Sequence, residues 1–507
     1  MRTDCGSCSH EFSTCNQACA GTDEEALVSA EASAPLASAV HTTFVVPPTN
    51  KRPKGAREEA DEFVGSHNSC RLCAPLGAGL AFRGIQGCTP ILHGSQGCST
   101  YIRRYLISHF REPIDIASTN FSESSAVFGG LENFKVGMKN VRKQYNPEVI
   151  GVASTCLSET IGENMPSLIH TYLEENWDEN HPPIVHVSTA SYKGCHTDGF
   201  NATVEAIVRA LVKPGEKNDL VALLPGMLSP ADLRYLRELA GAFKVQGIVL
   251  PDYSDSMDGA SWATYQRIPE GGTTVENIRR LGGAKAAMEF GLVLRNARSS
   301  ASQYLEKQYG VPRLALPTPI GMEGSDALLD AFAELSGNPI PDELAKERGR
   351  LIDSFVDGHK YVFGKRVAVV ADQDLALSLT KFMTEIGIKP VLVASGQQTG
   401  RFSSLLAETA PELGDSVICR ENADHAEIDA LAKEIKPDFI LGSSKCYPIA
   451  RALDLPLIRV GFPIHDRMGG QRVLHIGHRG AQQLFDTIVN TLLEKRQDDS
   501  EMGFSYM

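Results

Sequence analysis

The feature that most restricts the fold of this chain is a regular alternation of short apolar runs with amphipathic stretches, which begins near residue 65. Each run has about the length of a buried parallel strand, and the stretches between the runs repeat their apolar residues with a helical period. Alternation of this kind predicts right-handed βαβ units and doubly wound parallel sheets, so we expect an α/β fold. The apolar runs are PEVIGVAST, PPIVHVST, LVALLPG, VQGIVLPD, RVAVVAD, KPVLVASG, PDFILGSS and LPLIRVGFP.

The length of 507 residues corresponds to roughly three domains of ordinary size. Two polar breaks, at residues 213–218 and 357–360, divide the alternating pattern. We therefore predict three Rossmann-like doubly wound domains over residues 61–217, 218–358 and 359–507, the last with a long C-terminal helix. Residues 1–60 have no apolar period and contain many small, charged and proline residues, so we expect an irregular N-terminal arm.

Charge and composition exclude several classes of function. The chain has 49 Lys and Arg against 62 Asp and Glu, a net charge of −13, which argues against a non-specific nucleic-acid binder. The sequence has no run of about 18 apolar residues, so no membrane span is predicted. The first residues lack the basic region followed by an apolar region that is typical of a signal peptide. We therefore expect a soluble, cytoplasmic protein. No phosphate-binding glycine fingerprint follows any predicted strand, so we do not expect the chain to bind ATP or NAD.

The distribution of the 12 cysteines indicates metal chemistry. Stable disulfides are disfavoured in a reducing cytoplasm, where cysteines more often serve as buried thiols, metal ligands or catalytic groups. Cys73, Cys98 and Cys156 lie in the turn-rich sequences CAPLGA, HGSQGC and STCLSE, where small residues would let the backbone approach an inorganic cluster. Ser191 follows the next predicted strand and could supply an oxygen ligand or a hydrogen bond. One such cysteine is more often a packing residue, but three together favour a cluster site.

The same motifs carry a family resemblance. CAPLGA, HGSQGC, HFREP at residues 109–113, AVFGG at residues 126–130 and STCLSETIGEN resemble the β-type subunit of the nitrogenase component 1 superfamily. The intervals between the three cysteines fit the nitrogenase β subunit, and a weaker similarity extends to GFPIHDRMGGQR near the C-terminus. The resemblance implies the three-domain fold of nitrogenase component 1.

The resemblance also implies a role for each matching residue. Cys73, Cys98 and Cys156 match the ligands of half of an interfacial P-cluster (8Fe–7S), and Ser191 matches the serine that joins the oxidised cluster. An α-type partner supplies the remaining ligands in an α2β2 heterotetramer, and an ATP-binding Fe protein docks transiently to deliver electrons. In α-type subunits a cysteine holds an active-site cofactor of iron–sulfur type. Leu294 stands at that position in this chain, so we expect the cofactor on the partner and no catalytic residue in this chain.

The other cysteines have open roles. Cys70 could be a bystander or a further ligand, Cys88 is expected to pack in the core, and Cys195 lies close enough to Ser191 in sequence to be an additional ligand. The N-terminal arm could hold a separate Fe–S or Zn site, because both metals accept four thiolates. The four cysteines of the arm are Cys5, Cys8, Cys15 and Cys19.

Three functions fit these motifs. The first is electron relay in a nitrogenase-like reductase, for which we favour methylthio-alkane reduction, the cleavage of a carbon–sulfur bond. The N-terminal arm and the exact sequences of the motifs differ from those of ordinary nitrogenase β subunits. An alternative within this first function is that the chain is itself a nitrogenase β subunit. The second function is a NifN-like scaffold for assembly of the iron–molybdenum cofactor. The third, a metalloprotein that uses the N-terminal cysteines alone, leaves the HGSQGC region unexplained.

Overall fold

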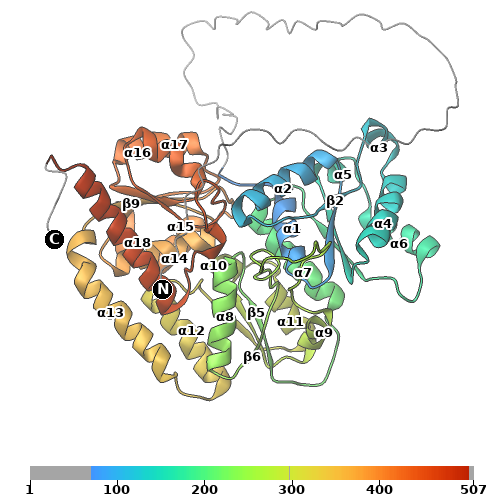
Figure 1. The fold of residues 1–507 in the computed structure, drawn as a ribbon, viewed down its shortest axis with the longest axis horizontal. Helices are drawn as coiled ribbons and strands as arrows, with labels where there is room; N and C mark the ends of the chain where they lie inside the picture. Colours follow the sequence, from blue (N-terminus) through green and yellow to red (C-terminus); the bar gives the residue numbers. More distant parts are fainter. Residues whose placement is uncertain (1–69, 296, 502–507) are drawn as a thin grey trace, which may run out of the picture. The chain divides into compact units, whose positions relative to one another are not determined.

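Three parallel β-sheets with helices on their faces make up the fold of this computed structural model (Figure 1). The structure describes residues 70–295 and 297–501. Each sheet lies within one of the three domains that the sequence predicts, although the limits of those domains stay a prediction. The α/β fold class is confirmed.

The first sheet has the strand order β2-β1-β3-β4, and every pairing is parallel. Its central strand β3 is buried along its whole length, as expected for an apolar run between two layers of helices. The strands are β1 (Cys88–His93), β2 (Ala117–Ser118), β3 (Val149–Ser154) and β4 (Ile184–Ser188). The helices are α1 (Ala74–Arg83), α2 (Gln96–Phe110), α3 (Glu123–Phe128), α4 (Leu131–Tyr145), α5 (Cys156–Thr160), α6 (Met165–Asn176) and α7 (His196–Leu211).

The second sheet has the order β6-β5-β7-β8, again parallel throughout. Helix α8 shows how the sequence starts its helices, because Ser229 caps it, Pro230 opens it and Asp232 completes the capping box. The strands are β5 (Leu220–Leu224), β6 (Gln246–Val249), β7 (Ala286–Phe290) and β8 (Arg313–Leu316). The helices are α8 (Pro230–Ala242), α9 (Val275–Arg280), η1 (Leu281–Gly283), α10 (Leu292–Arg295), α11 (Ala301–Tyr309), α12 (Gly321–Ser336) and α13 (Asp342–Val362).

The third sheet has the order β11-β10-β9-β12-β13. Counted from the first strand of this sheet, the order is 3-2-1-4-5, as in the first five strands of a Rossmann fold. Apolar clusters lie on both of its faces, one around Phe382 and one around Ile440, which makes it doubly wound. The strands are β9 (Arg366–Val370), β10 (Lys389–Ala394), β11 (Ile418–Arg420), β12 (Phe439–Gly442) and β13 (Leu457–Arg459). The helices are α14 (Gln373–Glu385), α15 (Phe402–Thr409), η2 (Pro411–Ser416), α16 (His425–Ile435), η3 (Ser444–Cys446), α17 (Tyr447–Ala452), η4 (Gly470–Arg472) and α18 (Gly477–Asp498).

Helix α13 connects the second and third sheets, and the last described helix, α18, packs against it. The polar break expected at residues 357–360 falls inside α13, which continues to Val362. Helix α18 packs along α13, where the rings of Phe355 and Phe485 lie 5.0 Å apart and Gly358 leaves room for Phe485 (Figure 1). This apolar contact explains why the polar residues of the break remain helical, because the buried side of α13 is stabilised by packing and not by local propensity.

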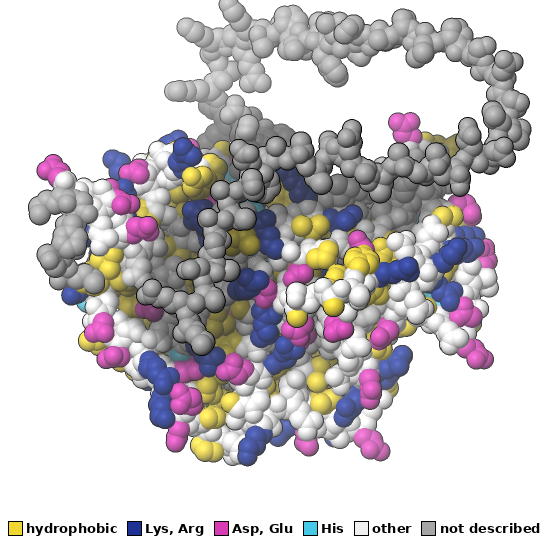
Figure 2. Space-filling model, viewed as in Figure 1, with side chains coloured by type: hydrophobic (Ala, Val, Ile, Leu, Met, Phe, Trp, Pro, Cys, Tyr) yellow, Lys and Arg dark blue, Asp and Glu magenta, His cyan; other side chains and the backbone are white. Residues whose placement is uncertain are grey.

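Acidic and basic side chains are interspersed on the face of the molecule in Figure 2. None of the described helices is long and apolar enough to cross a membrane. The eight described cysteines are all free thiols. The N-terminal cysteines Cys5, Cys8, Cys15 and Cys19 lie outside the described residues, so the predicted metal site of the arm stays a prediction.

Candidate functional site: a cluster of three thiols

The first domain brings three of the predicted cysteines together at the carboxyl edge of its sheet. Cys73 caps the N-terminus of α1, Cys98 lies in the first turn of α2 and Cys156 begins α5 directly after β3. All three are half-buried. Burial and the nearby thiols of Cys73 and Cys156 raise the pKa of the Cys98 thiol, which indicates that the three sulfurs interact electrostatically.

Short helices hold these thiols in place. The hydroxyl of Ser95 accepts a hydrogen bond from the N–H of Gly97 at 3.1 Å and so caps α2 just before Cys98. Thr155 and Ser158 form a capping box at the start of α5, with 2.9 Å between Thr155 N and Ser158 Oγ. The three thiols therefore all lie at helix N-termini.

Ser191 lies between two of the thiols. Its backbone N–H donates a hydrogen bond to Cys156 Sγ at 3.2 Å. Its hydroxyl oxygen accepts a hydrogen bond from the N–H of Ala74, the residue after Cys73, also at 3.2 Å. The structure thus places all four residues that the sequence singled out in one site.

The three thiols can each bind a different metal atom, as the ligands of an iron–sulfur cluster do. Within residues 70–295 and 297–501, no three His, Cys, Asp or Glu side chains come close enough to bind one metal ion. Thiols that are too far apart for one ion can still each bind a different iron of a larger iron–sulfur cluster. The N–H of Ser191 already donates to a sulfur, as backbone amides do around such clusters. The residues present therefore fit the P-cluster that the sequence resemblance implies.

The three remaining candidate cysteines of this region differ in position. Cys195 forms an isolated antiparallel bridge with Cys73 and is buried, but its sulfur faces Thr197 Oγ1 at 3.5 Å. Cys88 begins β1, and burial raises the pKa of its thiol to about 12, as expected for a packing residue. Cys70 is half-buried against the apolar cluster that contains Cys446, and burial followed by the nearby Cys446 raises its pKa.

Tyr101 is a neighbour of the thiols that the sequence analysis did not identify. It lies one turn after Cys98 on α2, and burial together with the adjacent Cys73 raises the pKa of its hydroxyl. A helical spacing of three residues from a motif cysteine is the signal that could have identified it. His93, in contrast, is fully buried at the end of β1, and its ring has no hydrogen-bond partner among the described residues. The ring packs edge-on against Phe121 and Phe134, with Nε2 3.8 Å from Glu163 Oε2.

A buried histidine links the thiol site to the third domain. The N–H of Leu72 donates to His196 Nδ1 at 3.3 Å, and His196 Nε2 lies 3.2 Å from Asp372 Oδ2. Leu72 precedes Cys73 and Asp372 follows β9, so this pair connects the first cysteine to the third sheet. No sequence motif indicates the pair, because its members are 176 positions apart.

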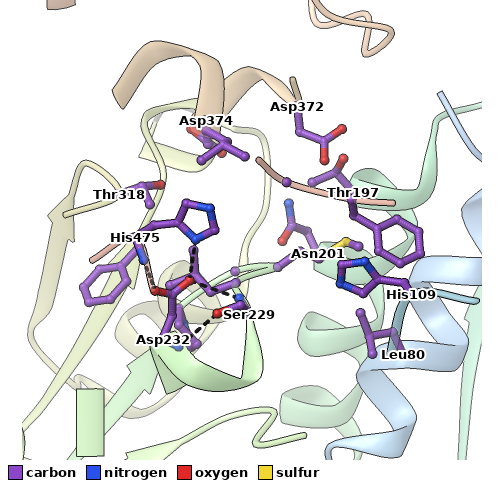
Figure 3. Close-up of a pocket in the computed structure, with 18 of the residues that line it drawn as sticks. Leu80, His109, Thr197, Asn201, Ser229, Asp232, Thr318, Asp372, Asp374 and His475 are labelled. Carbon is purple, nitrogen blue, oxygen red and sulfur yellow. Dashed lines mark hydrogen bonds and ion pairs between the residues drawn. The ribbon is translucent and has the colours of Figure 1, made fainter. Parts of the chain in front are cut away.

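Leu294 lines a cavity at the junction of the three sheets. This is the residue that stands where the resemblance places the cofactor cysteine of α-type subunits. Its side chain cannot bind a metal, and no cysteine is among the described residues that line the cavity. The cavity is shown in Figure 3.

The fold and the thiol site together define a class of protein: a chain of three doubly wound domains that presents a group of thiols at a partly exposed sheet edge. Residues 73–493 match the family described as nitrogenase component 1 type oxidoreductase. The chain belongs to this family, and it is a β-type subunit of a nitrogenase-like oxidoreductase.

Similar proteins support this assignment over most of the chain. The nitrogenase molybdenum-iron protein beta chain of Clostridium pasteurianum is 36% identical over 437 residues, which cover 84% of this chain and 93% of that protein. The nitrogenase vanadium-iron protein beta chain of Trichormus variabilis is 34% identical and covers 85% of this chain and 95% of its own. The solved structure of nitrogenase Cp1 at pH 6.5 superposes with a TM-score of 0.84 at 34% identity and covers 90% of this chain and 99% of its own.

Proposed function

We propose that this subunit holds half of a P-cluster (8Fe–7S) that relays electrons within a nitrogenase-like reductase. The observation that carries the proposal is the group of three half-buried thiols with the Ser191 amide bonded to Cys156 Sγ. Cys73, Cys98 and Cys156 would bind iron as thiolates, and the Ser191 hydroxyl would be accessible to the oxidised cluster. The chemistry that the cluster supplies when bound is electron transfer.

An α-type partner completes the site in this proposal. Three thiolates are too few for a cluster of eight irons, so further ligands have to come from a second chain. Apolar side chains near the thiols are accessible for such a contact: Tyr192 is 60% exposed, and Tyr101 and Leu157 are each 37% exposed. Exposed aromatic residues beside a functional site are typical of protein interfaces. The expected assembly is an α2β2 heterotetramer, with the active-site cofactor on the α-type chain because Leu294 replaces its ligand in this one.

The electrons would come from an ATP-hydrolysing Fe protein that docks transiently. Helix α3 ends in Val127 and Phe128, whose side chains are 74% and 88% exposed. Such exposed apolar residues at a helix end offer a small surface of the kind that short-lived complexes use. We place the complex in the cytoplasm, where reducing conditions keep the described cysteines as free thiols.

For the substrate, we propose a methylthio-alkane, whose carbon–sulfur bond the reductase would cleave. Two features of the sequence support this proposal. The three candidate cluster cysteines are all present, and the N-terminal arm and the motif sequences differ from those of ordinary nitrogenase β subunits. The similar proteins are named molybdenum-iron and vanadium-iron nitrogenase beta chains, so dinitrogen is the substrate to test against it.

The test is to purify this chain with its α-type partner and to measure iron content, EPR spectra and ATP-dependent turnover with the Fe protein. We expect P-cluster iron and release of methanethiol from 2-(methylthio)ethanol. Ammonia formation from dinitrogen without methanethiol release would assign the complex to nitrogenase. A simple cubane and transfer of a cofactor precursor to apo-nitrogenase would assign the chain to the cofactor scaffolds and contradict the reductase.

A further inference from the structure

A cavity of about 70 Å³ lies where the carboxyl ends of strands from the second and third sheets face α2 and α7 (Figure 3). Pro225 follows β5, Phe290 ends β7, and Asp372 follows β9. The carboxyl ends of parallel strands are where doubly wound proteins bind their ligands. The volume corresponds to about five water molecules at roughly 15 Å³ each, so a ligand in this cavity has to be small.

The charged side chains of the cavity wall are carboxylates. Asp232, Asp372 and Asp374 line the cavity, and no Lys or Arg is among its described lining residues. His109 adds no charge at neutral pH, because burial lowers its pKa to about 3 while its Nδ1 accepts a hydrogen bond from Ile464 N at 2.8 Å. Phe290 and Phe462 supply apolar, aromatic surface. A wall of this composition disfavours anions and favours a cation.

A buried imidazole nitrogen in the wall lacks a partner. His475 is 5% exposed, and its Nδ1 lies 3.1 Å from Asp232 Oδ2. Asp232 also accepts the N–H groups of His475 and Ile476, at 2.7 and 3.1 Å, so it has the contacts of a carboxylate and orients the ring. The Nδ1 proton therefore faces Asp232, and in the neutral form of the ring Nε2 presents its lone pair to the cavity. Nε2 is buried without any hydrogen bond among the described residues, and Figure 3 shows the ring directed into the cavity.

Asp374 is the carboxyl group that a cation would stabilise most. Asp372 already has His196 as a partner, at 3.2 Å. Asp374 accepts the N–H of Val293 at 2.9 Å but has no positively charged partner among the described residues. Burial, together with the negative charges of Asp372 and Glu289, raises its pKa to about 6. A cation beside Asp374 would offset this penalty and keep the carboxylate ionised.

We propose that this cavity binds a small ammonium ion, either NH4+ or a short primary alkylammonium, between His475 Nε2 and the carboxylate of Asp374. An ammonium group has only donors, which complements an imidazole lone pair and a carboxylate. A short alkyl group would lie against Phe290 and Phe462. A metal ion fits less well, because no three ligating side chains of the described chain come close enough to hold one. The proposal concerns a site apart from the three thiols and does not depend on their function.

The test uses the full chain purified with its α-type partner and methylammonium chloride as the probe, with binding followed by saturation-transfer NMR of the methyl protons. We expect one saturable site per chain. Asp374→Asn retains an acceptor for the Val293 N–H but loses the charge, and should weaken binding about tenfold, the size of one charged contact. Leu294→Trp should fill the cavity and abolish binding. Asp415→Asn, at an exposed carboxylate in η2, is the matched control and should bind as the unmodified chain does.

Three results would overturn the proposal: no saturable binding of methylammonium, equal binding by the Asp374→Asn variant, or equal binding of methanol, a neutral molecule of similar size. Melting temperatures of the variants, measured in the same buffer, distinguish lost binding from lost folding. Because Asp374→Asn changes no volume, its result decides the question even where Leu294→Trp unfolds. A series from NH4+ to butylammonium then gives the largest ion that the cavity admits.

Discussion

The backbone N–H of Ser191 donates a hydrogen bond to Cys156 Sγ at 3.2 Å, across the gap between the loops that follow β4 and β3. The hydroxyl oxygen of the same serine accepts the N–H of Ala74, beside Cys73. One residue therefore holds the loops of two thiols at a fixed separation.

Replacing Cys156 by alanine should remove iron without unfolding the chain. The residue is half-buried at the start of α5, so the loss of its thiol costs little packing, whereas a cluster would lose one of its three ligands from this chain. We expect the iron content of the purified complex to fall and electron delivery to be abolished. Wild-type iron content and a wild-type rate in Cys156→Ala would show that the thiol is not a ligand.

Cys88→Ala is the matched control for this experiment. Cys88 is 1% exposed in β1, where alanine leaves a small cavity and should destabilise the chain by about 1 kcal/mol. Its iron content should stay at the wild-type level. Iron analysis and melting temperature, measured on both variants, therefore separate ligation from packing.

Ser191→Ala should affect the oxidised state more than the reduced state. The backbone N–H that donates to Cys156 Sγ remains in this variant, while the hydroxyl oxygen is lost. We expect normal iron content after reduction and an altered EPR signal and midpoint potential on oxidation. Ser188→Ala removes a nearby hydroxyl that is bonded to Glu159 instead, and it should leave both signals unchanged. Identical redox titrations of Ser191→Ala and wild type would exclude a role for the hydroxyl.

The sheet edges and their loops were predictable from the sequence. In doubly wound sheets an apolar run followed by small residues ends at the carboxyl edge, which is why the loops after β3 and β4 could be expected side by side. This local rule placed Cys156 and Ser191 together, and their contact follows from it. The helix N-caps next to Cys98 and Cys156 are likewise predictable from local sequence, because capping depends on a few adjacent residues.

Contacts between domains were not predictable in this way. Asp232 and His475 are 243 positions apart, and the capping box that contains Asp232 does not indicate that its carboxylate meets His475. The polar break at residues 357–360 indicated a domain boundary, yet the structure continues α13 through it because Phe355 and Gly358 pack on α18. Tertiary packing decides such cases, and a single sequence does not state which distant residues will meet.

Gly77→Ala should separate α1 from α7 and disturb the thiol site. A Cβ atom at Gly77 would lie 1.8 Å from the carbonyl oxygen of His196, which is backbone and cannot move aside. The two helices would have to shift, at a cost of about 3 kcal/mol or more, and Cys73 lies at the start of α1. We expect a lower melting temperature and a lower iron content. Gly241→Ala, in α8 with open space around it, should instead stabilise the chain by about 0.5–1 kcal/mol.

Acid should destabilise this chain through its buried neutral histidines, and His109 illustrates the effect. Burial lowers the pKa of His109 from 6.5 to about 3. At a pH between these two pKa values, His109 is protonated in the unfolded chain and neutral in the folded chain. Stability therefore rises with pH across this window and is lost as pH falls below about 6.5. At pH 5.5 the loss from one such histidine is about 1.4 kcal/mol.

His109→Asn tests this linkage, because asparagine can still accept the Ile464 N–H that His109 Nδ1 accepts. The variant should be less stable than wild type at pH 7.5, owing to lost packing, and this difference should shrink by about 1.4 kcal/mol at pH 5.5. Melting temperatures between pH 5.5 and 7.5 measure both slopes. Equal slopes for His109→Asn and wild type would mean that His109 is protonated in the folded chain, against the burial of its ring.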